Sequence, residues 1–132
     1  MVDKGKKLEA DWQKLCKKRG LWSIRLYDTR SAGQFIPPQP SDYLIIQQHP
    51  EFIECKESDS TLLSFSNFQP AQLKAMKRAR ADKIKYTVIV LIKRKNYCSL
   101  DSGEILDAIY AGKKSIQLKD RAFSNSIDGA YI

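Results

Sequence analysis

The spacing of apolar residues predicts a helix at the start of the chain. Between Lys4 and Arg19, the apolar side chains Leu8, Trp12, Leu15 and Cys16 follow the period of one helical face. Gly20 comes next and is a favourable helix stop. A second helix is predicted over Pro70–Arg80, because proline is tolerated in the first helical turn. A third, short helix is expected after Asp101, which forms a possible capping box with Glu104.

Other segments have the composition of strands. Tyr86–Ile92 is almost continuously apolar, which is typical of a central strand covered on both faces. Asp42–Gln47 and Glu51–Lys56 flank the turn residues Gln48-His49-Pro50 and are expected to pair as a hairpin. The remaining expected strands are Leu21–Tyr27 and Ser115–Leu118. Helices alternating with strands predict an α/β fold, with a central mixed β-sheet flanked by helices.

Three stretches lack a regular pattern. Asp28–Ser41 contains three prolines and is expected to form an exposed loop. The polar segment Glu57–Asn67 is also expected to be a loop, and the tail from Lys119 is weakly patterned. The chain has 132 residues, of which 42% are hydrophobic, and this suits one domain with a real core. The sequence therefore predicts a single domain, residues 1–132.

The charge balance indicates a polyanionic partner. The chain carries 23 Lys and Arg against 15 Asp and Glu, a formal net charge of +8. Nucleic acid is the first candidate for such a partner, and an ordinary basic protein surface is the alternative. No apolar run approaches the roughly 18–20 residues that cross a bilayer, and the N-terminus does not resemble a secretory signal. We therefore expect no membrane association and a cytoplasmic location, whether the gene is chromosomal or carried by a plasmid or phage.

The residue inventory excludes several kinds of chemistry. His49 is the only histidine, and the three cysteines are far apart without a C-x-x-C pair. A structural zinc site, a disulfide framework and H-E-x-x-H zinc chemistry are therefore not indicated. Any hydrolytic mechanism would depend on carboxylates, lysine and a metal ion held by oxygen atoms.

The hairpin brings such residues together. If Gln48-His49-Pro50 is a three-residue turn, Asp42 faces Lys56 and Leu44 faces Glu54. Strand residues two apart share a face, so Asp42, Glu54 and Lys56 are expected on one face at one end of the hairpin. A two-residue turn would reverse the parity and place Asp42 on the other face.

Two carboxylates beside a lysine on an otherwise apolar hairpin need an explanation, because unpaired buried charge is costly. A divalent cation supplies one, since Mg²⁺ binds carboxylates, waters and substrate phosphate, and Mn²⁺ can substitute. Such an ion activates water and neutralises phosphate charge, and the lysine can stabilise the transition state. The alternative is a structural ion pair of Lys56 with Asp42 or Glu54 at the sheet edge.

These residues resemble the signature of the PD-(D/E)XK nuclease superfamily, which has a restriction-endonuclease-like core. The signature reads here as Pro40-Ser41-Asp42 and Glu54-Cys55-Lys56. Gly5-Lys6-Lys7-Leu8-Glu9 is similar to the start of the RecU and archaeal Hjc Holliday-junction resolvases, and the segment from Asn67 to Leu73 resembles a RecU-type segment whose glutamine corresponds to Gln72.

The resemblance implies roles by position. Asp42 and Glu54 would bind the metal, with the Cys55 carbonyl joining them and Glu9 as an outer or second-metal ligand. Lys56 would be the catalytic lysine, and Gln72 would position the water, the lysine or the phosphate.

The resemblance also implies a substrate and an assembly. The expected function is a Mg²⁺-dependent endonuclease that makes paired nicks in four-way DNA junctions, which requires a symmetric homodimer. Two alternatives remain: another DNA nuclease of the same superfamily, of the restriction or repair type, or a non-catalytic nucleic-acid-binding module. The candidates for DNA contact are Lys4, Lys6, Lys7, Arg30, Gln34, Lys74 and Arg78.

Overall fold

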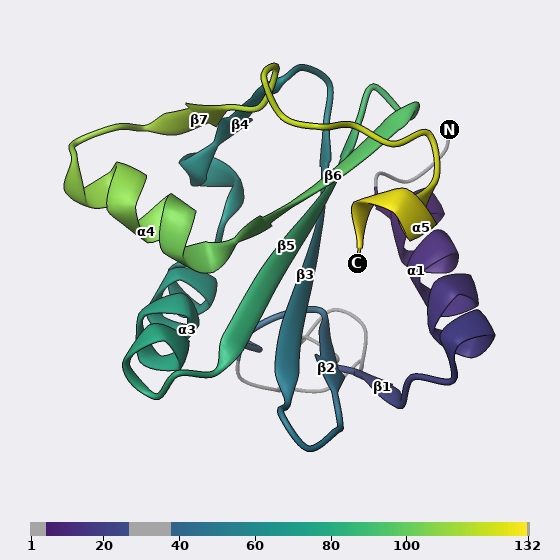
Figure 1. Cartoon of the computed structure of the whole chain (residues 1–132). Helices are drawn as coiled ribbons and strands as arrows, with labels where there is room; N and C mark the ends of the chain where they lie inside the picture. Colours follow the sequence, from purple (N-terminus) through teal and green to yellow (C-terminus); the bar gives the residue numbers. More distant parts are fainter. Residues whose placement is uncertain (1–4, 27–37, 132) are drawn as a thin grey trace.

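A mixed five-stranded sheet forms the centre of the protein (Figure 1). The computed structural model describes residues 5–26 and 38–131. The order of strands in the sheet is β1-β2-β3-β5-β6, and β4 and β7 form a separate two-stranded sheet. The elements are α1 (Lys6–Arg19), β1 (Ser23–Arg25), β2 (Tyr43–Ile45), β3 (Glu51–Ser58), β4 (Leu62–Ser64), η1 (Phe65–Asn67), α3 (Pro70–Ala81), β5 (Lys85–Ile92), β6 (Asn96–Asp101), α4 (Ser102–Tyr110), β7 (Ser115–Gln117) and α5 (Ile127–Ala130).

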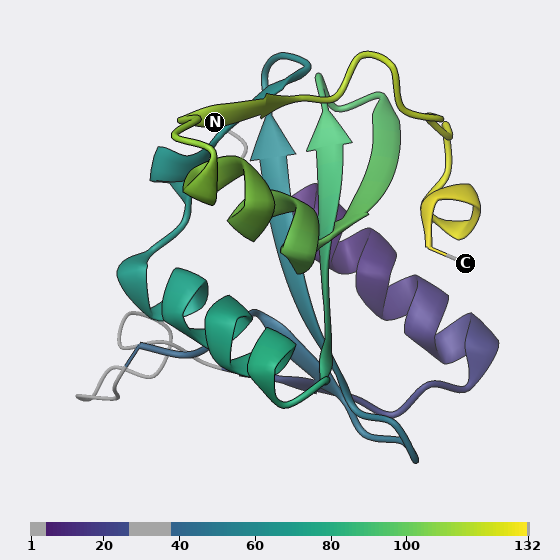
Figure 2. The ribbon, with the colours of Figure 1, turned by 60° about the vertical axis from the view of Figure 1, so that its left-hand side comes forward.

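Helices cover both faces of the sheet, so each face has its own core. Helices α1 and α5 lie on one side, and α3 and α4 lie on the other (Figure 2). Strand β5 shows the arrangement most clearly, since Ile89 packs in the core with α1 while Val88 and Val90 pack in the core with α3 and α4. The alternation follows from the pleat, which points successive side chains to opposite faces. The prediction that this apolar strand is covered on both faces is confirmed.

The two central strands run parallel. Strand β3 pairs with β5 in parallel, from Glu51 beside Lys85 to Ser58 beside Ile92. All the other neighbours in the sheet are antiparallel. Helix α3 lies between β3 and β5 in the sequence and makes the connection that a parallel pair requires. In the described ranges 5–26 and 38–131, no helix has the length and apolar character needed to span a bilayer.

Several predicted elements are confirmed and others were missed. The first helix ends where Gly20 adopts a left-handed φ of 66°. The capping box of α4 is present, with Asp101 accepting from the N–H of Gly103 and Glu104 from that of Asp101. The prediction of a loop over Glu57–Asn67 was wrong, because β4 pairs there with the distant β7. Strand β6 and helix α5 were not predicted.

A buried carboxylate ties the end of the chain to the sheet. Glu51 is 2% exposed, and its two oxygens accept hydrogen bonds from the hydroxyls of Thr87 and Tyr131. The Tyr131 ring also packs edge-on against Trp12, with ring centroids 5.0 Å apart. These contacts hold the C-terminal segment against α1, although the segment itself has little sequence pattern.

Tyr131→Phe is expected to lower the free energy of unfolding by about 1–3 kcal/mol. The substitution keeps the ring but leaves the buried Glu51 carboxylate with one hydrogen bond fewer. Urea unfolding followed by tryptophan fluorescence measures the change. Tyr110→Phe is the matched control, because Tyr110 is 71% exposed and should change stability by less than about 0.5 kcal/mol. Equal effects of the two substitutions would contradict the role of Glu51.

Candidate active site

The β2–β3 hairpin has a different register from the predicted one. Leu44 pairs with Phe52, not Glu54, and Ile45 pairs with Glu51. The connection therefore runs from Ile46 to Pro50, longer than the expected three-residue turn. The shift of two residues preserves parity, so Asp42, Glu54 and Lys56 still share a face. It also means that Asp42, just before β2, lies opposite Glu54 instead of Lys56.

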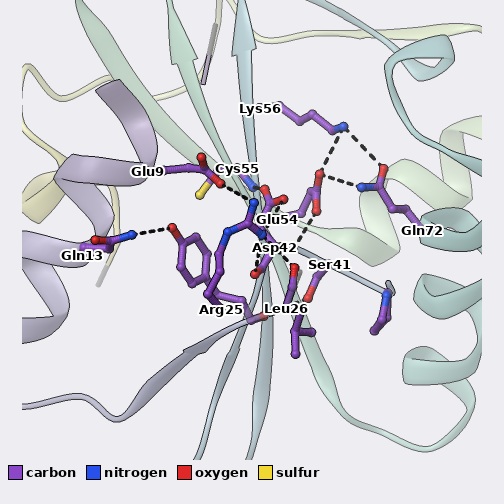
Figure 3. Close-up of polar contacts among 12 residues, drawn as sticks. Glu9, Gln13, Arg25, Leu26, Ser41, Asp42, Glu54, Cys55, Lys56 and Gln72 are labelled. Carbon is purple, nitrogen blue, oxygen red and sulfur yellow. Dashed lines mark hydrogen bonds and ion pairs between the residues drawn. The ribbon is translucent and has the colours of Figure 1, made fainter. Parts of the chain in front are cut away.

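Asp42 and Glu54 are joined through backbone groups (Figure 3). The N–H of Asp42 donates to Oε1 of Glu54 at 3.1 Å, and the N–H of Cys55 donates to Oδ2 of Asp42 at 2.9 Å. In an extended strand the N–H and C=O of one residue point to the same side. The Cys55 carbonyl therefore faces the strand edge at which Asp42 lies.

Lys56 and Gln72 hold the other oxygen of Glu54. The Lys56 ammonium lies 3.1 Å from Oε2 of Glu54, and the Gln72 amide donates to the same oxygen at 2.9 Å. Lys56 also donates to the Asn67 carbonyl at 2.7 Å and lies over the Phe68 ring. Gln72 is itself fixed, because its side-chain oxygen accepts from the N–H of Gln69 at the start of α3. Glu54, Lys56 and Gln72 therefore form one network.

The environment of Glu54 favours its protonated form. The carboxyl group is 2% exposed, and burial, together with the negative charge of Asp42, raises its pKa to about 7. Lys56 opposes this rise in the pKa without cancelling it. Two close carboxylates that one lysine does not fully compensate form a site that gains from another positive charge.

Arg25 supplies positive charge on the far side of Asp42. Its guanidinium lies 3.1 Å from Oε1 of Glu9 and 3.5 Å from Oδ1 of Asp42. It also donates to the backbone carbonyls of Leu26 and Asp42, both at 2.9 Å, and lies over the Tyr43 ring. Figure 3 shows the guanidinium between the two carboxylates. Sequence reasoning missed Arg25, because one arginine in a three-residue strand belongs to no recognisable motif.

The donor atoms at this edge fit a hard divalent cation. The carboxylates of Asp42 and Glu54 and the carbonyl of Cys55 are oxygen ligands, which Mg²⁺ prefers. Within residues 5–26 and 38–131, no three His, Cys, Asp or Glu side chains converge into a metal-binding group. Arg25 forms ion pairs with both Glu9 and Asp42. A metal held here would be bound by the Asp42 and Glu54 carboxylates and the Cys55 carbonyl. Glu9 would join these ligands once Arg25 moved.

The candidates for DNA contact differ in their exposure and in their ion pairs. Lys4, Arg30 and Gln34 fall outside the described residues. Lys6 and Lys74 are exposed on α1 and α3. Lys7 pairs with Asp11 at 3.1 Å, and Arg78 pairs with Asp82 at 2.6 Å, each within its own helix. The charges of Lys7 and Arg78 are therefore partly balanced within their own helices, which leaves less positive charge for a polyanion.

The metal-free protein is expected to lose stability as the pH rises. The folded pKa of Glu54 is about 7, against 4.5 for an ordinary glutamate, so between these values the folded state binds more protons than the unfolded state. The free energy of unfolding should fall by about 2–3 kcal/mol across this range. Urea titrations in EDTA at several pH values measure it. Glu54→Gln should remove this contribution, and identical pH profiles for the two proteins would contradict the assignment.

The arrangement defines a class of fold and site: a mixed sheet between two helical layers, with two carboxylates and a lysine beside its central strands. No protein-family model matches the chain, and no curated protein sequence matches it. Among solved structures, it is similar to Archaeoglobus fulgidus Hjc, a Holliday junction resolvase from an archaeal hyperthermophile. That likeness has a TM-score of 0.53 and 18% sequence identity, over 74% of this chain and 75% of that chain. The predicted fold class is therefore confirmed.

Proposed function

We propose that the protein is a metal-dependent DNA endonuclease that resolves Holliday junctions by paired nicks. The observation that carries the proposal is the cluster of Asp42, Glu54 and Lys56 on one face of a sheet with the fold of Hjc. The net charge of +8 suits a DNA backbone. A four-way junction offers two equivalent strands, so we further propose that a homodimer provides two sites.

Each residue of the site would have a separate role in the reaction. Mg²⁺, or Mn²⁺ in its place, would supply an activated water and neutralise charge on the scissile phosphate. Asp42, Glu54 and the Cys55 carbonyl would hold the ion. The Lys56 ammonium, which donates to the Asn67 carbonyl, would donate to a phosphate oxygen as its negative charge grows. Gln72 is a positioning residue, because it orients both Glu54 and Lys56.

A cleavage assay with two substrates tests the proposal. The protein is incubated with a four-way junction and with a linear duplex of the same sequence, each with Mg²⁺ and with EDTA. We expect Mg²⁺-dependent cleavage of the junction at symmetric positions on two opposing strands. Equal cleavage of both substrates would indicate a restriction or repair nuclease instead. Binding without cleavage in Mg²⁺ or Mn²⁺ would leave only a nucleic-acid-binding module.

A further inference from the structure

The turn between β5 and β6 carries three consecutive cations, Lys93, Arg94 and Lys95, all exposed. The first two adopt φ values of 52° and 56°, and the N–H of Lys95 donates to the Ile92 carbonyl at 3.0 Å. Tight hairpin turns with two positive φ values strongly favour Asn-Gly, because side chains are disfavoured in this region. Lys93 and Arg94 therefore carry long basic side chains on a backbone that glycine or asparagine adopts more easily.

The turn is anchored to neighbouring elements. Arg94 forms an ion pair of 3.0 Å with Glu57, whose side chain is 6% exposed. The other oxygen of Glu57 accepts from the N–H of Gly5 at the start of α1. The N–H of Lys93 donates to the Ser58 carbonyl at 2.8 Å. These contacts fix the turn beside both the end of β3 and the beginning of α1, where Lys6 is exposed.

The two lysines keep their positive charge unmatched. Among the described residues, no carboxylate lies within ion-pair distance of Lys93 or Lys95, whereas the charge of Arg94 is balanced by Glu57. Ser58, which holds the turn, comes four residues after Glu54 on β3. At the rise of a strand this separation is about 13 Å, which one DNA strand covers in about four nucleotides.

We propose that Lys93 and Lys95 bind backbone phosphates of the DNA arm that enters the active site, a few nucleotides from the scissile bond. The inference rests on the proposed nuclease function and adds a second, sequence-independent contact to it. Arg94 is a positioning residue here, because its pairing with the buried Glu57 holds the turn in place. A solvated turn with no ligand is the alternative.

Two matched substitutions test the proposal. Lys93→Gly removes a charge and relieves a left-handed backbone. Lys83→Gly does the same at the other end of β5, because Lys83 has a φ of 58° and is exposed, about 25 Å away. Both variants should keep or raise the melting temperature, since glycine tolerates positive φ. Junction affinity is measured in EDTA at several salt concentrations.

We expect Lys93→Gly to weaken junction binding about 3- to 10-fold at 0.1 M salt and to reduce the salt slope by about 0.9. Adding Lys95→Gln should roughly double the change in slope, and Lys83→Gly should leave binding unchanged. Equal slopes for Lys93→Gly, Lys83→Gly and the unaltered protein would overturn the inference even if junctions are still cleaved. Failure of the unaltered protein to bind or cleave DNA would overturn the proposed function itself.

Discussion

Asp42→Asn and Glu54→Gln are each expected to reduce junction cleavage by a factor on the order of 10³ or more, while DNA binding stays within about threefold. Either substitution removes a carboxylate that would hold the metal, and the activated water is lost with it. Both substitutions keep nearly the same side-chain shape, but in Glu54→Gln the new NH₂ group must face a donor, either the Asp42 N–H or Lys56 and Gln72. Circular dichroism therefore checks that each variant is folded. Single-turnover cleavage in Mg²⁺ measures the first effect, and binding in EDTA measures the second.

Asp107→Asn is the control for these two variants. Asp107 is an exposed carboxylate on α4 that pairs with Arg80, and its substitution changes the net charge by the same amount. Cleavage by this variant should remain within about twofold of the unaltered protein, as expected for a surface change away from the site. If Asp42→Asn and Glu54→Gln also cleave at that level, the cluster is a structural ion network and not an active site.

The sequence suggested Gln72 as a site residue, and the structure shows what it contacts. The family resemblance suggested a glutamine on the helix after the E-x-K strand, and the structure places the Gln72 amide 2.9 Å from Glu54. Local rules explain only how its side chain is held, because Pro70 starts the helix and Gln72 occupies its third position, where a side chain can reach back to Gln69. The same position directs the amide toward β3.

The hairpin shows why a site can be predicted with the wrong register. Its connection is longer than the turn signal indicated, and pairing moved by two residues. Side chains alternate with period two, so this error leaves every residue on its predicted face. The set of Asp42, Glu54 and Lys56 was therefore predictable, whereas the direct opposition of Asp42 and Glu54 was not.

Two of the elements that escaped prediction, β4 and α5, depend on distant partners. Strand β4 has three residues and pairs with β7, which follows it by about fifty positions. Helix α5 is one turn long and is held by Arg19, which donates to the Tyr131 carbonyl. Neither has enough residues to show a period. By contrast, α1 and β5 are long, and their apolar patterns determine which faces they bury.

Arg25 also escaped prediction, and its position leads to a prediction about metal affinity. Its guanidinium lies between Glu9 and Asp42 and balances the charge that a divalent cation would otherwise balance. A metal bound to Asp42 must compete with this internal cation. Removing the competitor should leave both carboxylates available, at the cost of their mutual repulsion in the metal-free protein.

Arg25→Gln is therefore expected to bind Mn²⁺ about 10- to 30-fold more tightly, corresponding to roughly 1.4–2 kcal/mol. Calorimetric titration with Mn²⁺ alone measures the affinity without any cleavage assay. Arg19→Gln is the matched control, since Arg19 also pairs with a carboxylate, donates to carbonyls and lies over a tyrosine ring, but at α5. Unchanged or weaker Mn²⁺ binding by Arg25→Gln would show that Arg25 orients the carboxylates for the metal instead of competing with it.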